Sequence, residues 1–265
     1  MQRTFFHLTL ATVFMLSACQ SQPEAPTVDF DQIYQYSTIK ALLEGHYDGQ
    51  LTFEELAAHG DFGLGTFNAL DGEMIALDGT FYQVKASGEV DTVALGMRTP
   101  FAVMTHFKAD TTVTLNGDIN YIQVRELLDQ VIPGENLFYA IRIEGEFGEM
   151  KVRSVPRQEP PYRPLAEVTD EQSMYGYSRT VGTMVGFRSP SYTEEITVPG
   201  YHMHYLSDDR QKGGHVLYFE SIRATVHIDF LPNLHMALPT DDTFHQLNLR
   251  EDRSEELNKV ETLDD

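Results

Sequence analysis

Near residue 210 the chain has two apolar segments that each contain histidine, separated by a polar segment that ends in two glycines. The first segment reads Gly-Tyr-His-Met-His-Tyr, with His202 and His204 two positions apart. Side chains alternate along a strand, so this spacing predicts that both histidines lie on one face. The polar segment 207–214 is typical of a hairpin turn, and the apolar residues 216–219 would form the returning strand. The hairpin would place His215 beside the first pair and requires β-sheet at this point of the fold.

Three neutral imidazoles on neighbouring strands match a tetrahedral zinc site with one position left open. An open position is typical of a catalytic zinc rather than a structural one. The only cysteine of the chain is Cys19, far from this hairpin, so a closed cysteine site is excluded here. The alternative is an ordinary pair of strand histidines, since such pairs are common without metal. We expect a reactive Zn2+ held by His202, His204 and His215.

The first residues are typical of an export signal. A short start with Arg3 is followed by an apolar run and small residues, which predicts a secretory signal over residues 1–18. The sequence Leu-Ser-Ala-Cys at its end resembles a bacterial lipobox, in which Cys19 is lipidated. An ordinary cleaved signal is the alternative. Residues 19–30 would form a tether, so we expect an exported, lipid-anchored envelope protein, at the outer membrane or periplasmic face if the source is Gram-negative.

The net charge of the chain is -21. Such acidity argues against nucleic acid as a partner, because nothing neutralises the phosphates. With a single cysteine, an intramolecular disulfide is excluded. A chain of 265 residues with 42% hydrophobic content can form one large domain or two small ones.

The hydrophobic patterns predict an α+β fold dominated by β-sheet, with mixed sheets and a few short helices. Residues 52–59 begin with a capping-box pattern, and residues 122–131 have helical spacing. Much of 63–107 reads as strand, with Asp-Gly turns. Further strands are expected at 138–145, 175–187, 198–206 and 215–230, with a helix-prone tail at 252–263.

The clearest boundary is the proline-rich segment 156–164. It predicts an N-terminal α+β half at 31–157 and a C-terminal β half at 158–265. The histidine hairpin belongs to the second half, so we expect the zinc site on the C-terminal sheet, together with an active-site tail.

Five blocks of the sequence stand out: GDFGLGTF at 60–67, LDGEM at 70–74, TPFAV at 99–103, RSVP at 153–156 and GYHMH at 200–204. Taken in order, they resemble the α-acetolactate decarboxylase family. The resemblance runs from about residue 33 to the C-terminus. It implies a zinc-dependent carboxy-lyase that converts 2-acetolactate to acetoin, in acetoin and butanediol biosynthesis, and a possible homodimer.

The resemblance also implies roles for individual residues. Taken alone, Glu73 after an Asp-Gly turn and Glu261 in an acidic tail would be solvated acids, and Arg153 a surface residue. By resemblance they become active-site groups. The implied set is His202, His204 and His215 as zinc ligands, Glu73 and Glu261 as active-site carboxylates, Arg153 as the substrate-binding arginine and Thr66 as a residue lining the pocket.

The expected chemistry explains these residue types. Loss of carbon dioxide leaves electron density that must flow into the adjacent ketone, and Zn2+ can stabilise that charge as a Lewis acid. Arg153 would hold the substrate carboxylate, and Glu73 or Glu261 would deliver the proton. Which glutamate is the donor stays open. No organic cofactor is needed, because the β-keto acid provides its own electron sink.

Two other functions are compatible with a His-x-His strand. One is a cupin-like metalloenzyme acting on another small oxo or hydroxy acid, although no glutamate follows His204 at the interval customary in cupins. The other is a non-catalytic envelope lipoprotein. The combination of His202, His215, Arg153 and Glu73 with His204 favours the enzyme, because an inactive protein would be free to lose any of them.

Overall fold

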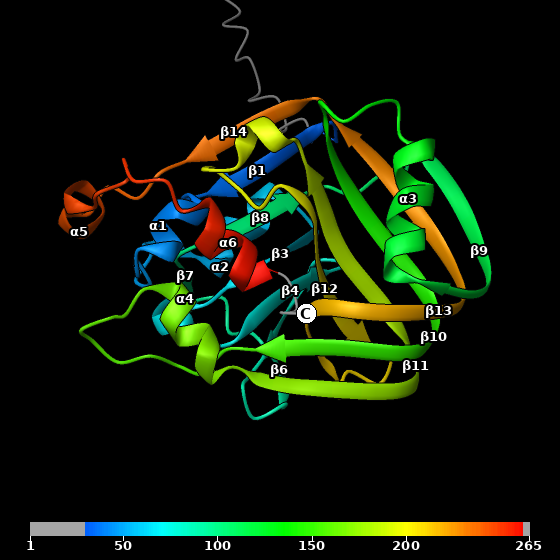
Figure 1. Cartoon of the computed structure of the whole chain (residues 1–265). Coiled ribbons are helices and arrows are strands. Elements are labelled where there is room, and N and C mark those ends of the chain that lie inside the picture. Colours follow the sequence, from blue (N-terminus) through cyan, green and yellow to red (C-terminus); the bar gives the residue numbers. More distant parts are fainter. Residues whose placement is uncertain (1–29, 262–265) are drawn as a thin grey trace, which may run out of the picture.

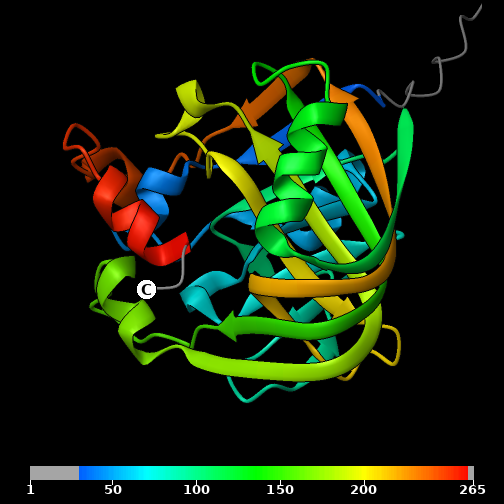
Figure 2. The ribbon, with the colours of Figure 1, turned by 45° about the vertical axis from the view of Figure 1, so that its right-hand side comes forward.

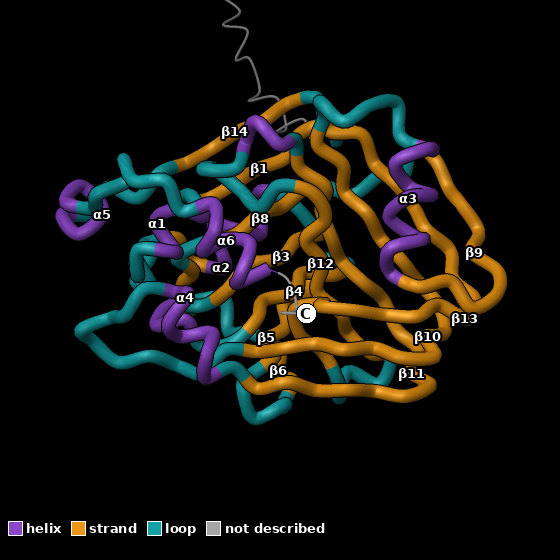
Figure 3. The backbone as a smooth tube through the Cα atoms, viewed as in Figure 1, coloured by secondary structure: helices purple, strands orange, loops and turns teal. Residues whose placement is uncertain are grey.

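The computed structural model describes residues 30–261, so the predicted signal, Cys19 and nearly all of the predicted tether lie outside the described residues. Strand is the main secondary structure of this part of the chain (Figure 3). No helix within residues 30–261 is long and apolar enough to cross a membrane. The helices are α1 (Ile39–Leu43), α2 (Phe53–Leu56), α3 (Tyr121–Val131), α4 (Leu165–Val168), α5 (Asp242–Gln246) and α6 (Ser254–Glu261).

The first sheet has seven strands in the order β14-β1-β8-β3-β4-β5-β6. β1 and β14 are parallel and the other neighbours are antiparallel, so the sheet is mixed, as predicted. A separate two-stranded sheet pairs β2 (Leu51–Thr52) with β7 (Arg98–Thr99). The seven strands are β1 (Gln32–Tyr36), β3 (Phe62–Thr66), β4 (Glu73–Leu77), β5 (Thr80–Val84), β6 (Val90–Thr92), β8 (Ala102–Thr105) and β14 (Asn233–Ala237).

The second sheet closes on itself (Figure 1). Its order is β10-β11-β12-β13-β9, and β10 also pairs with β13, so four strands form a ring. Closure gives each of these four strands a partner on both sides over part of its length. Within its core, Phe147 packs edge to face against both Tyr205 and Phe219, with ring centroids 5.8 Å apart in each pair. The strands are β9 (Thr111–Asn120), β10 (Phe138–Ser154), β11 (Ser173–Ser189), β12 (Gly200–Ser207) and β13 (Gly213–Leu231).

The two sheets pack on each other through one hydrophobic core. Leu64 and Val103 of the first sheet share a buried cluster with Val185 and Phe187 of the second, and Leu257 of α6 joins it. α6 lies beside α1 and α4 in both views (Figures 1 and 2). This packing brings β4, β10, β12, β13 and α6 together, and the candidate site forms where they meet.

The predicted fold class is confirmed, and so are several elements. The capping box is present at α2, where Thr52 and Glu55 each accept a hydrogen bond from the other's backbone N–H. Asn120 and Gln123 form the same arrangement at the start of α3. The strands expected at 175–187, 198–206 and 215–230 correspond to β11, β12 and β13.

The sheets do not follow the division predicted at residue 157. β9 and β10 precede that residue but belong to the second sheet, whereas β14 follows it and joins the first. The reason is that β13 is long enough to hydrogen-bond along the whole of β10 and also to β9. The proline-rich segment 156–164 is a connection between β10 and α4, and Gln158 within it is buried.

Candidate active site

The predicted histidine hairpin is formed by β12 and β13. His204 lies directly opposite His215 in their register, and His202 shares the face of His204. Gly214 permits this approach, because its φ is +141° and a Cβ there would lie 2.5 Å from the carbonyl oxygen of Arg153. The three histidines each offer a ligand nitrogen, and these nitrogens lie within 4.8 Å of one another. Within residues 30–261 no other set of His, Cys, Asp or Glu meets that condition.

Hydrogen bonds orient the imidazoles. Nδ1 of His204 donates to the carbonyl oxygen of Met74 at 2.8 Å, which leaves the lone pair on Nε2 facing the site. Nε2 of His202 lies 3.2 Å from Nδ1 of His215. A carbonyl that fixes one ring nitrogen is the usual outer partner of a metal-binding histidine. The carbonyl group of Met74 in the first sheet therefore fixes the orientation of His204 in the second sheet.

Three charged side chains converge on the histidines from other elements. Glu73 of β4 places Oε2 3.5 Å from Nε2 of His204, and Glu261 at the end of α6 places Oε2 3.5 Å from Nε2 of His215. Arg153 of β10 lies between the acids. Its Nη1 is 3.7 Å from Glu73 and its Nη2 is 3.9 Å from Glu261. The residues predicted from distant parts of the sequence thus lie in one cluster.

Burial governs protonation in this cluster. It raises the pKa of both Glu73 and Glu261 to about 7, against the opposing charge of Arg153. Burial lowers the pKa of His202 to about 3, and Arg153 adds to that effect. At neutral pH the imidazole is therefore a neutral ligand, and each carboxyl is set to hold or release a proton.

Thr66 also lies at the site. It is opposite Glu73 in the β3–β4 register, and its hydroxyl donates to the carbonyl oxygen of Gly72 at 2.7 Å. Its hydrogen is therefore engaged within the protein, and its oxygen lone pairs remain to accept. The cavity it lines with the histidines, Arg153 and the two glutamates has a volume of about 40 Å3.

The apolar wall of this cavity is the part that sequence reasoning missed. It comes from α1, α4, α6 and the segments just before β4, before β8 and after β10, which the chain order does not place together. Leu70, Phe101 and Val155 did carry a signal, since each belongs to one of the blocks that resemble the family. The apolar side chains are Ile39, Leu42, Leu70, Phe101, Val155, Leu165 and Val260.

α6 carries Glu261 into the cluster and is held by packing and charge. Leu257 and Val260 are buried in the core shared by the sheets. Just before the helix, Arg253 donates from Nε and Nη2 to one carboxylate oxygen of Glu44, at 2.8 and 2.7 Å. The position of Glu261 therefore depends on contacts made one to two turns earlier in the chain.

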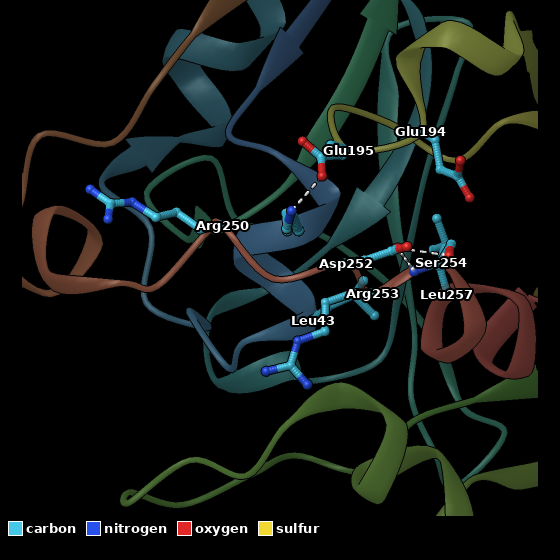
Figure 4. Close-up of a pocket in the computed structure, with 9 residues that line it drawn as sticks. Leu43, Glu194, Glu195, Arg250, Asp252, Arg253, Ser254 and Leu257 are labelled. Carbon is cyan, nitrogen blue, oxygen red and sulfur yellow. Dashed lines mark hydrogen bonds and ion pairs between the residues drawn. The ribbon is translucent and has the colours of Figure 1, made fainter.

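A second cavity, of about 300 Å3, lies on the outer side of α1 and α6 (Figure 4). The ammonium of Lys40 donates to the Glu195 carboxylate at 2.5 Å, and Asp252 accepts hydrogen bonds from the backbone and hydroxyl of Ser254. Lys40, Glu195 and Asp252 therefore have partners within the protein, and none of the residues predicted for the site lines this cavity. We assign it no part in the chemistry.

The residues of the first cavity fit a divalent metal. Nε2 of His204 and Oε1 of Glu73 are buried and have no hydrogen-bond partner among the described residues. Such atoms are costly unless a ligand or ion satisfies them. Three neutral imidazoles are a preferred ligand set for Zn2+. His202, His204 and His215 would hold the ion.

Comparisons with known proteins agree with this geometry. The sequence model described as alpha-acetolactate decarboxylase matches residues 33–251. An alpha-acetolactate decarboxylase of Methanosarcina mazei is 45% identical over 87% of this chain and 80% of its own length. One of Klebsiella aerogenes is 44% identical over 82% of this chain and 84% of its own length. A crystal structure of alpha-acetolactate decarboxylase from Bacillus subtilis covers 88% of this chain and 100% of its own, with a TM-score of 0.86 and 38% identity. The chain belongs to the alpha-acetolactate decarboxylase family.

Proposed function

We propose that this protein is a metal-dependent decarboxylase that converts 2-acetolactate to acetoin and carbon dioxide, with Zn2+ as the metal. One observation carries the proposal. A single buried cavity contains three imidazoles, a guanidinium and two carboxyls whose pKa values lie at about 7. The curated relatives named above support the same substrate, since their names give alpha-acetolactate.

The substrate brings a carboxylate, a hydroxyl and a ketone to the cavity. Arg153 binds the carboxylate. Its Nη atoms lie 3.7 and 3.9 Å from the glutamates, too far for close hydrogen bonds, and its Nε has no hydrogen-bond partner among the described residues, so the guanidinium can donate to the substrate. When bound, Zn2+ supplies Lewis-acid charge for the hydroxyl and ketone oxygens. The apolar wall excludes water, which strengthens both interactions.

The protein then supplies a proton. The carbon–carbon bond to the carboxylate breaks, carbon dioxide leaves, and the electron pair moves toward the ketone as an enediolate. Glu73 or Glu261, in its neutral form, donates a proton to carbon and gives acetoin. Each acid is held on a secondary-structure element beside the histidines. Whichever acid is the donor therefore delivers the proton to one face of the intermediate. This predicts a single enantiomer of acetoin.

The test is acetoin formation from racemic 2-acetolactate by the purified protein, followed with resolution of the acetoin enantiomers. Glu73→Gln and Glu261→Gln are measured separately, because only the donor's variant should lose turnover or stereochemical purity. Glu54→Gln, on an exposed position of α2, is the matched control. Absence of acetoin from the native protein would refute the proposal.

The two alternative functions are tested by the same experiment. Family membership favours 2-acetolactate over the other small acids that a cupin-like enzyme would take. A non-catalytic envelope protein would bind metal without forming acetoin. Measuring metal content on the same sample separates these outcomes.

We also propose export and lipid anchoring through Cys19, which the sequence pattern at 1–19 supports. The protein should then fractionate with membranes, and Cys19→Ser should release it. A native protein found wholly in the cytosol would overturn this placement. The homodimer implied by resemblance stays a prediction, which light scattering of the purified protein tests.

A further inference from the structure

A third cavity, of about 370 Å3, lies next to the candidate active site on its outer side. It is formed by the start of α3, the start of β12, the first part of β13 and one side of α6. Glu261 lines both this cavity and the catalytic one. Its side chain, 13% exposed, is therefore a wall shared between the two spaces.

One cation faces this outer cavity. Arg125 of α3 is exposed, and its guanidinium lies 5.4 Å from the ring centre of Tyr121 and 5.6 Å from that of Tyr201. Two aromatic rings restrict the guanidinium without neutralising it. Among residues 30–261, no carboxylate lies within ion-pair distance of Arg125. Its charge is thus directed at the cavity.

The acids nearest these walls already have hydrogen-bond partners. Asp129 accepts from the Tyr201 hydroxyl at 2.6 Å and from Arg188 at 3.3 Å. Glu220 accepts from the Tyr218 hydroxyl at 2.8 Å. Glu261 is the one carboxyl that lines the cavity itself, and it faces Arg153 on the inner side.

The proposed substrate is an anion, so the charge distribution around the outer cavity affects how it approaches the active site. The chain carries a net charge of -21, so an anion approaching it meets a repulsive field over much of the surface. At an ionic strength of about 0.1 M, salt screens such fields beyond about 10 Å. A cation at the entrance can still attract an anion that comes within that distance. Arg153 lines the inner cavity, Arg125 lines the outer one, and Glu261 lines both.

We propose that the outer cavity is the entrance to the active site and that Arg125 is a positioning residue that captures the carboxylate of the incoming substrate. The carboxylate then passes Glu261 and exchanges the guanidinium of Arg125 for that of Arg153. This inference rests on the proposed function for the identity of the anion. It adds an entrance, a direction of approach and a residue that acts before the chemistry.

The first test is the salt dependence of steady-state kinetics with 2-acetolactate. Arg125→Gln should lower kcat/KM by about 3- to 10-fold at 10 mM ionic strength through KM, and the difference should shrink toward zero near 0.5 M salt. Arg125→Lys keeps the charge and should recover most of the loss. Arg98→Gln, an exposed site on β7 with the same charge change, should match the native protein. An unchanged kcat/KM at low salt, or a salt-independent loss in kcat, would overturn the proposal.

A second measurement does not require turnover. The chain has no tryptophan, so Ile122→Trp places a single reporter on the outer cavity wall. Its fluorescence is titrated with 2-hydroxy-2-methylbutanoate, an anion that cannot decarboxylate, and with the neutral amide of that acid. The anion should bind more tightly than the amide, and Arg125→Gln in the same background should weaken that preference, leaving the part that Arg153 supplies. If the native protein forms no acetoin but this preference is present, the proposed function fails and the entrance stands. Equal binding with and without Arg125 would refute the entrance.

Discussion

Replacing Arg153 should separate substrate binding from metal binding. The Arg153 side chain is 5% exposed and faces two carboxyls, so a substrate carboxylate that enters the cavity has this guanidinium as its nearest cationic partner. Arg153→Ala should lower decarboxylation severely while the protein keeps its metal, because the three histidines and the carbonyl that orients His204 are untouched.

The magnitude follows from the lost contacts. A hydrogen bond to a charged group contributes about 1.5–3 kcal/mol, and a bidentate guanidinium makes two. The loss of about 3–6 kcal/mol corresponds to about 10²- to 10⁴-fold in kcat/KM. Arg153→Lys keeps the charge but not the paired geometry and should lose about 10-fold. The assay is acetoin formation together with metal content per chain, with Arg98→Gln as the control for charge.

Two results would refute this reasoning. Activity of Arg153→Ala within threefold of the native protein would show that the guanidinium does not hold the carboxylate. Loss of metal in the same variant would show that Arg153 supports the ligand cluster rather than the substrate.

The same variant should also show a further rise in the pKa of Glu73 and Glu261, because the charge of Arg153 lowers the pKa of both.

Three further predictions address the ligands, a buried acid and the helix. His202→Ala should lose both metal and turnover, and a stoichiometric metal in that variant would remove His202 from the ligand set. Burial raises the pKa of Asp229 to about 7, so its ionisation destabilises the folded state as pH rises from about 4 to 7. The free energy of unfolding of Asp229→Asn should therefore exceed that of the native protein increasingly over that range, by up to about 4 kcal/mol at pH 8 and by nothing at pH 3. Melting curves of the variant and the native protein that coincide at pH 8 as well as at pH 3 would contradict this. Arg253→Gln removes the contact to Glu44 and should speed amide exchange of α6 by about 5-fold, with a lower kcat/KM; unchanged exchange would show that packing alone holds the helix.

Local features of this protein were predictable from sequence because they depend on neighbouring residues. The histidine hairpin follows from strand alternation and a glycine-ended turn, and the helix start at Thr52 follows from a capping box. The ligand geometry was therefore accessible before any fold was known. Family resemblance supplied the remaining site residues.

Long-range placement was not predictable from local patterns. Glu73 follows an Asp-Gly turn, which favours an exposed acid, yet the packing of β4 against β12 leaves it 6% exposed. Glu261 lies in an acidic tail and reaches the site only because α6 packs on the shared core. The predicted boundary at residue 157 was misleading because strand pairing between β10 and β13 crosses it. Burial and pairing between distant segments decide these features.

The central claim is that the three-histidine cluster holds a metal that the decarboxylation requires. The most direct test measures metal content and acetoin formation on one sample of the purified protein, before chelation, after chelation and after addition of Zn2+. We expect one metal ion per chain, loss of acetoin formation on chelation and recovery with Zn2+. Full acetoin formation by the metal-free protein would contradict it.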